Sequence, residues 1–370
     1  MIAARGLEGV IVGTSGICLI DGNAGRLSYR GYDIRELASS LSFEEVAYLL
    51  WNGDLPNQKQ LDELKARLDQ ERAIPTKLKT AIRDLPASSN TLDVLRTAVS
   101  ILGTGIPLKK PDMADAIAIA AKIPTINAAF ERIRKGQEPV DPRNGLSHAA
   151  NYLYMLTGRE PDPVKVDALN KYLVLLADHG MNTSTFTARV VASTWSDMYS
   201  AITAAIGALK GPLHGGAPAP VLKMLETIGS PERAEEWMRN ELKAGRRLMG
   251  FGHRVYRTTD PRGEFLREIA GKTADPGFVR LARQVEEVGI RVLQEYRPER
   301  KLYANVEFYS SVVMRSVGLP PDMFTATFAA SRCIGWTTNV LEQVANNRLI
   351  RPEMEYTGHT NRHVVPMDQR

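Results

Sequence analysis

Three histidines of this sequence stand in short stretches rich in glycine and other small residues. His179 lies in ADHGMNTSTF, His214 in GPLHGGAPAP and His253 in MGFGHRVYR. A glycine beside a histidine permits sharp turns and lets the backbone approach a ligand closely. One histidine on a turn is usually a satisfied polar residue, but three in such settings indicate a functional site.

Three arginines could bind anionic groups. Arg262 lies in TTDPR, Arg332 inside the apolar segment 324–347, and Arg351 in RLIRPEMEYTG. An arginine within an apolar stripe needs an anionic partner, because burying an unpaired charge costs free energy. The partner is either an Asp or Glu of the same protein or a carboxylate of a substrate, which guanidinium binds in a bidentate manner.

Glu307 raises a third chemical question, because it stands between two apolar residues. Its neighbours are Val306 and Phe308, and a carboxylate is costly to bury among apolar groups. Three interpretations are open at this point: a catalytic base, a structural acid, or a sign that the chemistry of the site has been altered.

Several common kinds of site are not indicated. There is no HExxH or CxxC motif, and no two of the three histidines have helical ligand spacing, so we expect no metal site. A GxSxG elbow is missing as well, which argues against a serine hydrolase. Gly250-Phe251-Gly252 lacks the third glycine of a dinucleotide-binding fingerprint.

The elements that must position these residues are mostly helices. Asp162 and Pro163 start a helical pattern that runs toward His179, where Gly180 is placed to end it. Residues 9–33 are instead rich in β-formers and turn signals, which is typical of one or two short hairpins. Further helices are predicted over residues 198–211, 231–246, 276–295 and 324–347. We therefore predict an all-α fold with a small N-terminal β-hairpin region.

The composition is that of an ordinary globular protein. The 370 residues are 44% hydrophobic and 24% charged, with a net charge of +5. Basic residues alternate with acidic ones, as in DELKARLDQER, so we expect no nucleic-acid partner. The two cysteines, Cys18 and Cys333, indicate a reducing compartment. Because we find no signal peptide and no long apolar run, we expect a cytoplasmic protein without a membrane partner.

Taken together, the motifs resemble the citrate synthase family, in its compact bacterial and archaeal type. The resemblance covers essentially the whole chain, through YRGYDIRELA, GPLHGGA, MGFGHRVYRTTDPR, SRCIGW and RLIRPEMEYTG. It implies a mainly helical homodimer of two-domain subunits. Residues 1–214 and 320–370 would form a large domain and residues 215–319 a small one, with the active site in the cleft between them. Domain closure over oxaloacetate would create the acetyl-CoA site.

The resemblance also implies an activity. The chain would be an acyltransferase of the tricarboxylic acid cycle that condenses acetyl-CoA with oxaloacetate and water to give citrate and CoA. The steps would be enolisation, aldol-type attack and thioester hydrolysis. The family needs no metal or other cofactor, since acetyl-CoA is a co-substrate.

Residue roles follow from the resemblance position by position. His214 matches the histidine that hydrogen-bonds the thioester carbonyl, and His253 matches the one that polarises the carbonyl of oxaloacetate. Further ligands of oxaloacetate would be His179, Arg262, Arg332 and Arg351, of which Arg351 would come from the partner subunit. The expected coenzyme A contacts are Gly250, Phe251, Gly252, Arg257 and Lys301.

Glu307 departs from the family pattern, which has an aspartate as the base at this position. Ser311 departs too, where the family has a glycine. Glutamate has similar basicity, but its extra methylene moves the carboxylate by about 1 Å, and such misplacement can cost roughly 10²-fold in rate. A slow or inactive relative is therefore an alternative. Another is a 2-methylcitrate synthase acting on propionyl-CoA, because pockets distinguish one methylene by only ~1–3 kcal/mol.

Overall fold

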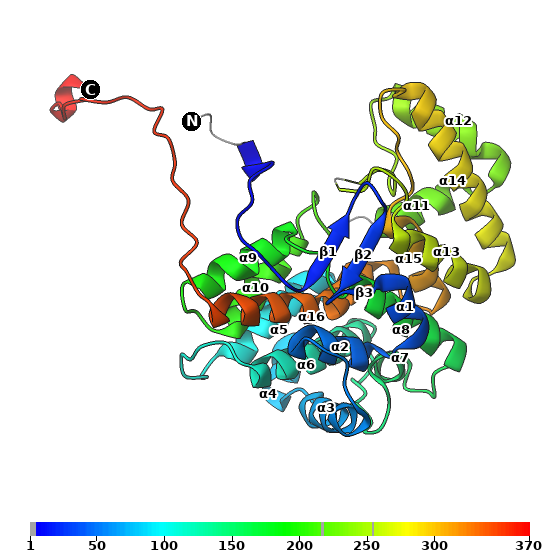
Figure 1. Ribbon diagram of the computed structural model, residues 1–370, viewed down its shortest axis with the longest axis horizontal. Helices are drawn as coiled ribbons and strands as arrows, with labels where there is room; N and C mark the ends of the chain where they lie inside the picture. The colour runs from blue at the N-terminus through cyan, green and yellow to red at the C-terminus, as the bar shows by residue number, and fades with distance from the viewer. Residues whose placement is uncertain (1–4, 216–217, 254) are drawn as a thin grey trace.

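The computed structural model describes residues 5–215, 218–253 and 255–370. Residues 216, 217 and 254, which belong to the GPLHGGA and MGFGHRVYRTTDPR motifs, lie outside this description. Within the described ranges the chain is mostly helical, with one small antiparallel sheet near the N-terminus (Figure 1). The predicted fold class is confirmed.

The sheet is a short meander in the order β1-β2-β3. Its strands are β1 (Cys18–Asp21), β2 (Arg26–Tyr29) and β3 (Tyr32–Asp33). Asp21 closes the first turn, because its Oδ1 accepts hydrogen bonds from the backbone N–H groups of Asn23 and Ala24. The hairpins predicted within residues 9–33 are confirmed.

A first group of helices forms the larger part of the molecule around α16 (Phe324–Ala345). Its other members are α1 (Ile34–Ser40), α2 (Phe43–Asn52), α3 (Gln58–Glu71), α4 (Thr76–Arg83), α5 (Thr91–Gly103), α6 (Met113–Arg134), α7 (His148–Thr157), α8 (Pro163–Leu176), α9 (Thr183–Ser193) and α10 (Met198–Leu209). α16 packs against α2, α6, α8 and α9, so it is shielded from solvent over most of its length. Its Trp336 is completely buried.

A second group of helices lies together at one end of the molecule (Figure 1). It consists of α11 (Pro218–Ile228), α12 (Ala234–Lys243), α13 (Pro261–Thr273), α14 (Pro276–Tyr296) and α15 (Val306–Ser316). α13 and α15 pack on α8 of the first group. An ion pair of 2.6 Å between Arg35 and Glu268 also joins α1 to α13. The domain boundaries expected at residues 214 and 319 stay a prediction, although the two groups fall on either side of them.

The end of α8 positions the turn that carries His179. Asp162 caps this helix and Pro163 occupies its first turn, as predicted. The helix ends at Leu176, however, before the expected stop at Gly180. Tertiary hydrogen bonds replace the last helical turn: the Tyr29 hydroxyl donates to the Asp178 carbonyl at 2.9 Å, and the Gly335 N–H donates to the Ala177 carbonyl at 3.0 Å.

The remaining helix predictions agree closely with the observed elements. Residues 231–246 form a 3-10 turn (Pro231–Arg233) followed by α12, while α10, α14 and α16 lie where helices were expected. Of the described helices, α6 alone is long and apolar enough to cross a membrane. Since 83% of that stretch is buried inside the protein, α6 is a core helix.

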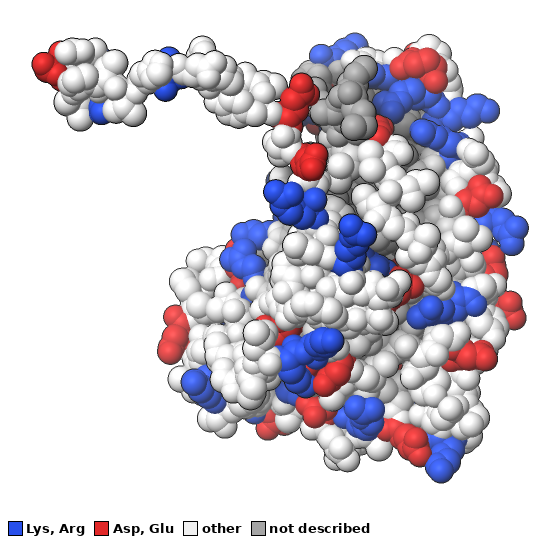
Figure 2. Space-filling view, turned by 60° about the vertical axis from the view of Figure 1, so that its left-hand side comes forward, with Lys and Arg blue, Asp and Glu red and all other residues white. Residues whose placement is uncertain are grey.

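Residues 6–15 and residues 351–370 lie outside the helical body (Figure 1). Residues 351–370 are exposed throughout, and only Pro366–Arg370 contains a helical turn. Figure 2 shows the C-terminal segment projecting from the body, with basic and acidic side chains interspersed over the face that is drawn. That face carries no continuous basic stripe of the kind that binds nucleic acid.

Gly335 should be intolerant of a side chain. An added Cβ would lie 2.4 Å from both the Ala177 carbonyl and an Asp178 carboxylate oxygen. Gly335→Ala should therefore lower the free energy of unfolding by about 1–3 kcal/mol, measured by denaturant titration. Gly271→Ala on α13 is the control, since its Cβ would meet only the flexible end of Arg283. Equal stability of the two variants would contradict the predicted clash.

Candidate active site

His214 lies in the loop after α10 and is held by the first turn of α9. Its Nε2 is 2.8 Å from the Ser184 hydroxyl and 3.3 Å from the Ser184 backbone nitrogen. That hydroxyl also accepts a hydrogen bond from the indole of Trp336 at 3.0 Å. Because a backbone N–H can only donate, Nε2 is the acceptor, and the proton of the neutral ring lies on Nδ1.

His253 has the opposite tautomer for the same reason. Its Nδ1 accepts from the backbone N–H groups of Val255 and Tyr256 at 3.0 and 3.1 Å. The proton of its neutral ring therefore lies on Nε2. Burial, and secondly the charge of Arg262, lowers the pKa of His253 to about 4. Burial, and secondly Arg332, lowers the pKa of His214 to about 4 as well.

His179 lies beside His253, in the turn between α8 and α9. The two ring centroids are 5.4 Å apart, and Tyr256 packs against both rings. The Tyr256 hydroxyl is 3.3 Å from Nε2 of His179. Burial, and then the charges of Arg262 and Arg332, lowers the pKa of His179 well below its usual value. The site thus holds neutral imidazoles among fixed cations.

Arg262 begins α13 and is paired within the protein. Its Nε and Nη2 donate to the two carboxylate oxygens of Asp260 at 3.0 and 2.7 Å, and both residues are buried. Burial opposes the charge, but the pairing with Asp260 raises the pKa of Arg262. Of the two partners considered for this arginine, an acidic residue of the same protein is therefore correct for one side of the guanidinium. The described residues offer no hydrogen-bond acceptor to Nη1.

Arg332 is buried in α16 without a carboxylate in contact. Only 2% of it is exposed, and its Nε donates to the Leu176 carbonyl at 2.9 Å. The guanidinium lies 4.7 Å from the centroid of the Phe328 ring. Neither Nη nitrogen has a hydrogen bond or ion pair within the described ranges. Burial lowers the pKa of Arg332, and attraction to Asp178 only partly opposes this effect. Such a group favours binding an anion from outside the chain.

Glu307 lies in the first turn of α15 and is half-buried. Burial raises the pKa of its carboxyl group, whereas the charges of Arg262 and Arg332 oppose the rise. The carboxylate is thus close enough to both arginines to feel their charges. A carboxyl group with a raised pKa is a stronger proton acceptor once ionised, which suits a general base.

The glycines before His253 bring two loops together next to Glu307. Gly250 and Gly252 have φ angles of 82° and 84°, which disfavour other residues. The Gly250 carbonyl accepts from the Asn305 N–H at 2.9 Å, and Phe251 packs on Phe308. These contacts connect the loop of His253 to the start of α15.

The other expected ligands do not gather at this site within one chain. Arg257 is exposed, and its backbone N–H donates to the Gly22 carbonyl at 2.8 Å. Lys301 is exposed at the edge of a cavity of about 500 Å³ that Arg291 and Tyr303 also line. Arg351 is exposed, and the hydrogen bonds described for residues 351–370 stay within that segment.

Several residues of the site were not identified from the sequence. Ser184 had no signal, since the histidine that it contacts lies 30 residues away in the chain. Tyr256 likewise needs the fold to reach His179. Asp260 could have been found, because an acid two residues before an arginine at a helix start can both cap the helix and pair with the arginine. No cluster of three or more potential metal ligands occurs among the described residues.

Known proteins similar to this chain share its full length. A family model described as "Citrate synthase, C-terminal domain" matches residues 6–353. "Citrate synthase 2" of Bacillus subtilis is 46% identical, with 100% of both chains covered. The chain belongs to the citrate synthase family. The family match confirms the resemblance seen in the motifs and the acyltransferase class of enzyme.

Solved structures agree with this family membership. The crystal structure of citrate synthase from Thermotoga maritima has a TM-score of 0.89 at 42% identity, covering 99% of each chain. A ternary complex of the Thermoplasma acidophilum citrate synthase with carboxymethyl coenzyme A and oxaloacetate has a TM-score of 0.92 at 34% identity, again over 99% of each chain. A "2-methylcitrate synthase" of Mycobacterium tuberculosis is 39% identical over 98% of this family member and 92% of its own length.

The depressed histidine pKa values should make stability depend on pH. The folded-state pKa of His214 is about 4, below the ordinary value near 6.5. Between these values only the unfolded chain binds the proton, so the stabilising contribution is present above about pH 6.5 and lost as the pH falls toward 4.

His214→Gln should therefore lose less stability than the parent between pH 7 and pH 5, measured by denaturant unfolding. His359→Gln, in the exposed C-terminal segment, is the control and should behave as the parent does. An unchanged pH dependence in His214→Gln would contradict the assignment.

Proposed function

We propose that this family member condenses acetyl-CoA with oxaloacetate and water, giving citrate and CoA. The observation that carries the proposal is Arg332, a buried guanidinium whose Nη nitrogens have no acceptor in the described protein. Beside it lie Arg262, two imidazoles and the carboxyl group of Glu307. A dicarboxylate would neutralise the arginines and place its carbonyl group at the histidines.

In this proposal oxaloacetate binds first. Arg262 and Arg332 hold its carboxylates, together with His179 and Arg351 of a second copy of the chain. His253 donates its Nε2 proton to the carbonyl oxygen, because its Nδ1 is occupied by two backbone N–H donors. A neutral donor polarises the carbonyl without competing with the arginines for the carboxylates.

Acetyl-CoA is then activated by a base and a donor acting together. Glu307 removes a proton from the methyl group, while Nδ1–H of His214 hydrogen-bonds the thioester oxygen. Since the pKa of His214 is about 4, its imidazole is neutral and stabilises the developing enolate by this hydrogen bond, while the methyl proton resides on Glu307. The enolate carbon attacks the carbonyl carbon of oxaloacetate, and the alkoxide that forms takes up a proton in place of the one removed. Water then hydrolyses the resulting citryl-CoA thioester to release CoA.

Coenzyme A would bind along the loop 250–252 and the exposed cations nearby. Arg257 and Lys301 supply positive charge for its phosphates. The loop is supported by the hydrogen bond between Gly252 and Tyr303 at 2.8 Å. The proposed chemistry uses no metal or redox cofactor, because neutral donors and fixed cations stabilise the developing charge.

The catalytic groups are divided between two parts of the chain. His253, Arg262 and Glu307 belong to the segment 215–319, whereas His214 and Arg332 belong to the flanking segments. We propose that these are the small and large domains and that their closure over oxaloacetate completes the acetyl-CoA site. A homodimer would supply Arg351 across the interface. We place the enzyme in the cytoplasm, since both cysteines are free thiols.

Thiol release tests the proposed reaction directly. The purified chain should release CoA from acetyl-CoA only when oxaloacetate is present, followed with a chromogenic thiol reagent. Propionyl-CoA in the same assay tests the 2-methylcitrate alternative, and kcat/KM should favour acetyl-CoA. No release with either thioester would refute the proposal, and a preference for propionyl-CoA would assign the alternative reaction.

Substitutions at Glu307 test its role as the base. Glu307→Gln should reduce kcat by at least about 10²-fold while oxaloacetate binding is retained, since only the proton acceptor is lost. Glu307→Asp should keep or raise kcat, because it restores the residue that the family has at this position. Turnover of the Gln variant at the parent rate would show that Glu307 is not the base.

Mixing two inactive variants tests the contribution of Arg351 from a second chain. Arg351→Ala and His214→Gln should each be nearly inactive alone. After dissociation and random pairing, roughly half of the dimers are mixed and each has one intact site, so activity should recover to roughly a quarter. No recovery would place Arg351 in the same chain's site or outside the site.

A further inference from the structure

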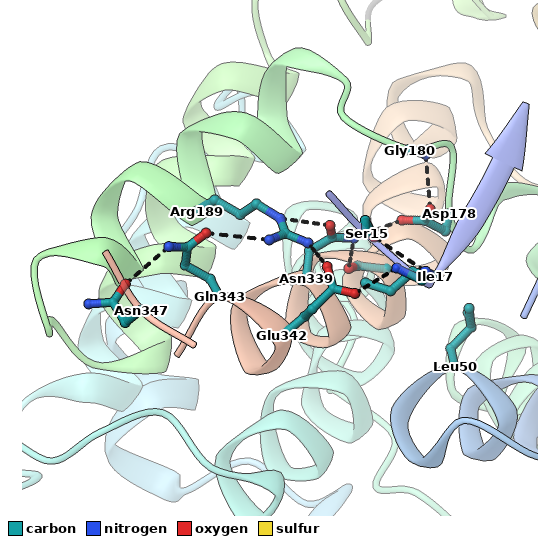
Figure 3. Close-up of polar contacts among 12 residues, drawn as sticks. Ser15, Ile17, Leu50, Asp178, Gly180, Arg189, Asn339, Glu342, Gln343 and Asn347 are labelled. Atoms are coloured by element: carbon teal, nitrogen blue, oxygen red, sulfur yellow. Dashed lines mark hydrogen bonds and ion pairs between the residues drawn. The ribbon is translucent and has the colours of Figure 1, made fainter. Parts of the chain in front are cut away.

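A line of polar side chains runs from Asn347, just after α16, to Asp178 and its partner Gly180 (Figure 3). Arg189 of α9 faces Asn339, Glu342 and Gln343 of α16, and we call these four residues together with Asp178 the Arg189 network. The Nε of Arg189 donates to Oδ1 of Asn339 at 2.9 Å, and its Nη2 pairs with Glu342. Nδ2 of Asn339 donates to Oδ1 of Asp178 at 3.2 Å.

Asp178 is the member of the Arg189 network that lies next to the proposed substrate site. It is completely buried and directly precedes His179. Its Oδ2 accepts from the Gly180 N–H at 2.9 Å, so the carboxylate spans the backbone on both sides of His179. Among the charges around Arg332, Asp178 is the one that most opposes the loss of its proton. Asp178 thus holds the turn of His179 by a hydrogen bond and favours the charged form of Arg332 without contacting it.

At its other end, the Arg189 network contacts the residues from which the N-terminal and C-terminal segments leave the helical body. Oε1 of Glu342 accepts from the Gly16 N–H at 3.0 Å, just before the first strand. Gln343 donates to Asn347 at 3.0 Å, and Asn347 donates to the Ser193 carbonyl at 3.0 Å. The Ser193 hydroxyl in turn accepts from the backbone N–H of Ile350, the residue before Arg351.

Asn339 is the residue that links Arg189 to Asp178. Its amide accepts from Arg189 and donates to Asp178 and to the Gly335 carbonyl, so every polar atom of its side chain is used. Arg189 fixes the orientation of the amide, because a guanidinium can only donate and so requires Oδ1 on its side. The NH₂ group is thereby directed to Asp178.

We propose that Asn339 and Arg189 are positioning residues for oxaloacetate: through Asp178 they fix the turn that carries His179, a residue that neither of them touches by a hydrogen bond. This inference rests on the proposed function and deepens it. Residues behind the direct ligands of a site commonly orient those ligands, and removing them weakens binding without removing a contact to the substrate. A purely structural role would instead lower stability and leave the substrate constants unchanged.

Asn339→Ala tests the proposal. It should raise KM for oxaloacetate about tenfold, the effect of one lost hydrogen bond to a charged group. KM for acetyl-CoA and kcat should stay within about twofold, because Glu307 and His214 are not held by Asp178. Asn346→Ala is the matched control, since Asn346 is exposed at the end of α16. A lowered melting temperature with unchanged KM for oxaloacetate would overturn the proposal.

Arg189→Lys is a second variant that keeps the charge beside Glu342 but lacks the fork that orients Asn339. It should also raise KM for oxaloacetate. The double variant should have a KM for oxaloacetate no higher than that of Asn339→Ala alone. Multiplying effects would show that the two residues do not act through one route. Arg189→Lys also keeps the test decisive if Asn339→Ala fails to fold.

Calorimetric titration with oxaloacetate separates failure of this inference from failure of the proposed reaction. A parent chain that binds oxaloacetate but releases no CoA would refute the reaction alone, and weaker binding by the variants would still support the positioning role. Variants that bind oxaloacetate as the parent does would overturn the inference alone. A parent chain that does not bind oxaloacetate would overturn both.

Discussion

The structure depends on one incompletely paired charge in its interior. Arg332 lies in α16, which packs against α2, α6, α8 and α9, with its Nε on the Leu176 carbonyl and its Nη nitrogens without a protein acceptor among the described residues. Leaving a buried cation partly unpaired costs stability, so the surrounding core must offset this cost. If a dianionic substrate binds there as proposed, it would recover this cost, since the desolvation of the guanidinium has already occurred in the folded protein. Dense packing around α16 and recognition of a carboxylate would then be two aspects of one arrangement.

Backbone donors fix the tautomers of the two imidazoles that we propose face the substrates. His214 receives the Ser184 N–H, and His253 receives two consecutive N–H groups of its own loop. Since these donors cannot rotate or reverse, each ring presents its N–H on the opposite side. The nearby guanidinium groups further disfavour an imidazolium. Neutral donors beside permanent cations would therefore allow the proposed site to bind anions and to activate carbonyl groups at the same time.

Much of this could be predicted from local patterns, and the rest could not. The helix at Asp162-Pro163 and the hairpin near Asp21 follow from caps and turns that act within a few residues. The end of α8 was misplaced, because Tyr29 and Gly335 are distant in sequence and supply hydrogen bonds that a helix would otherwise make. Ser184 and Asn339 were not predicted as parts of the site for the same reason, because their partners are brought near only by packing. The histidines and arginines were found because their residue types are unusual in their surroundings.

The exposed C-terminal segment has a consequence for how activity varies with concentration. If a second copy supplies Arg351, then each active site is complete only in the dimer. Dilution below the dimer dissociation constant would then abolish activity without unfolding the protein. Mass action then works in both directions, because oxaloacetate bridging two chains favours the associated form. The substrate would in this way help to assemble the catalyst that consumes it.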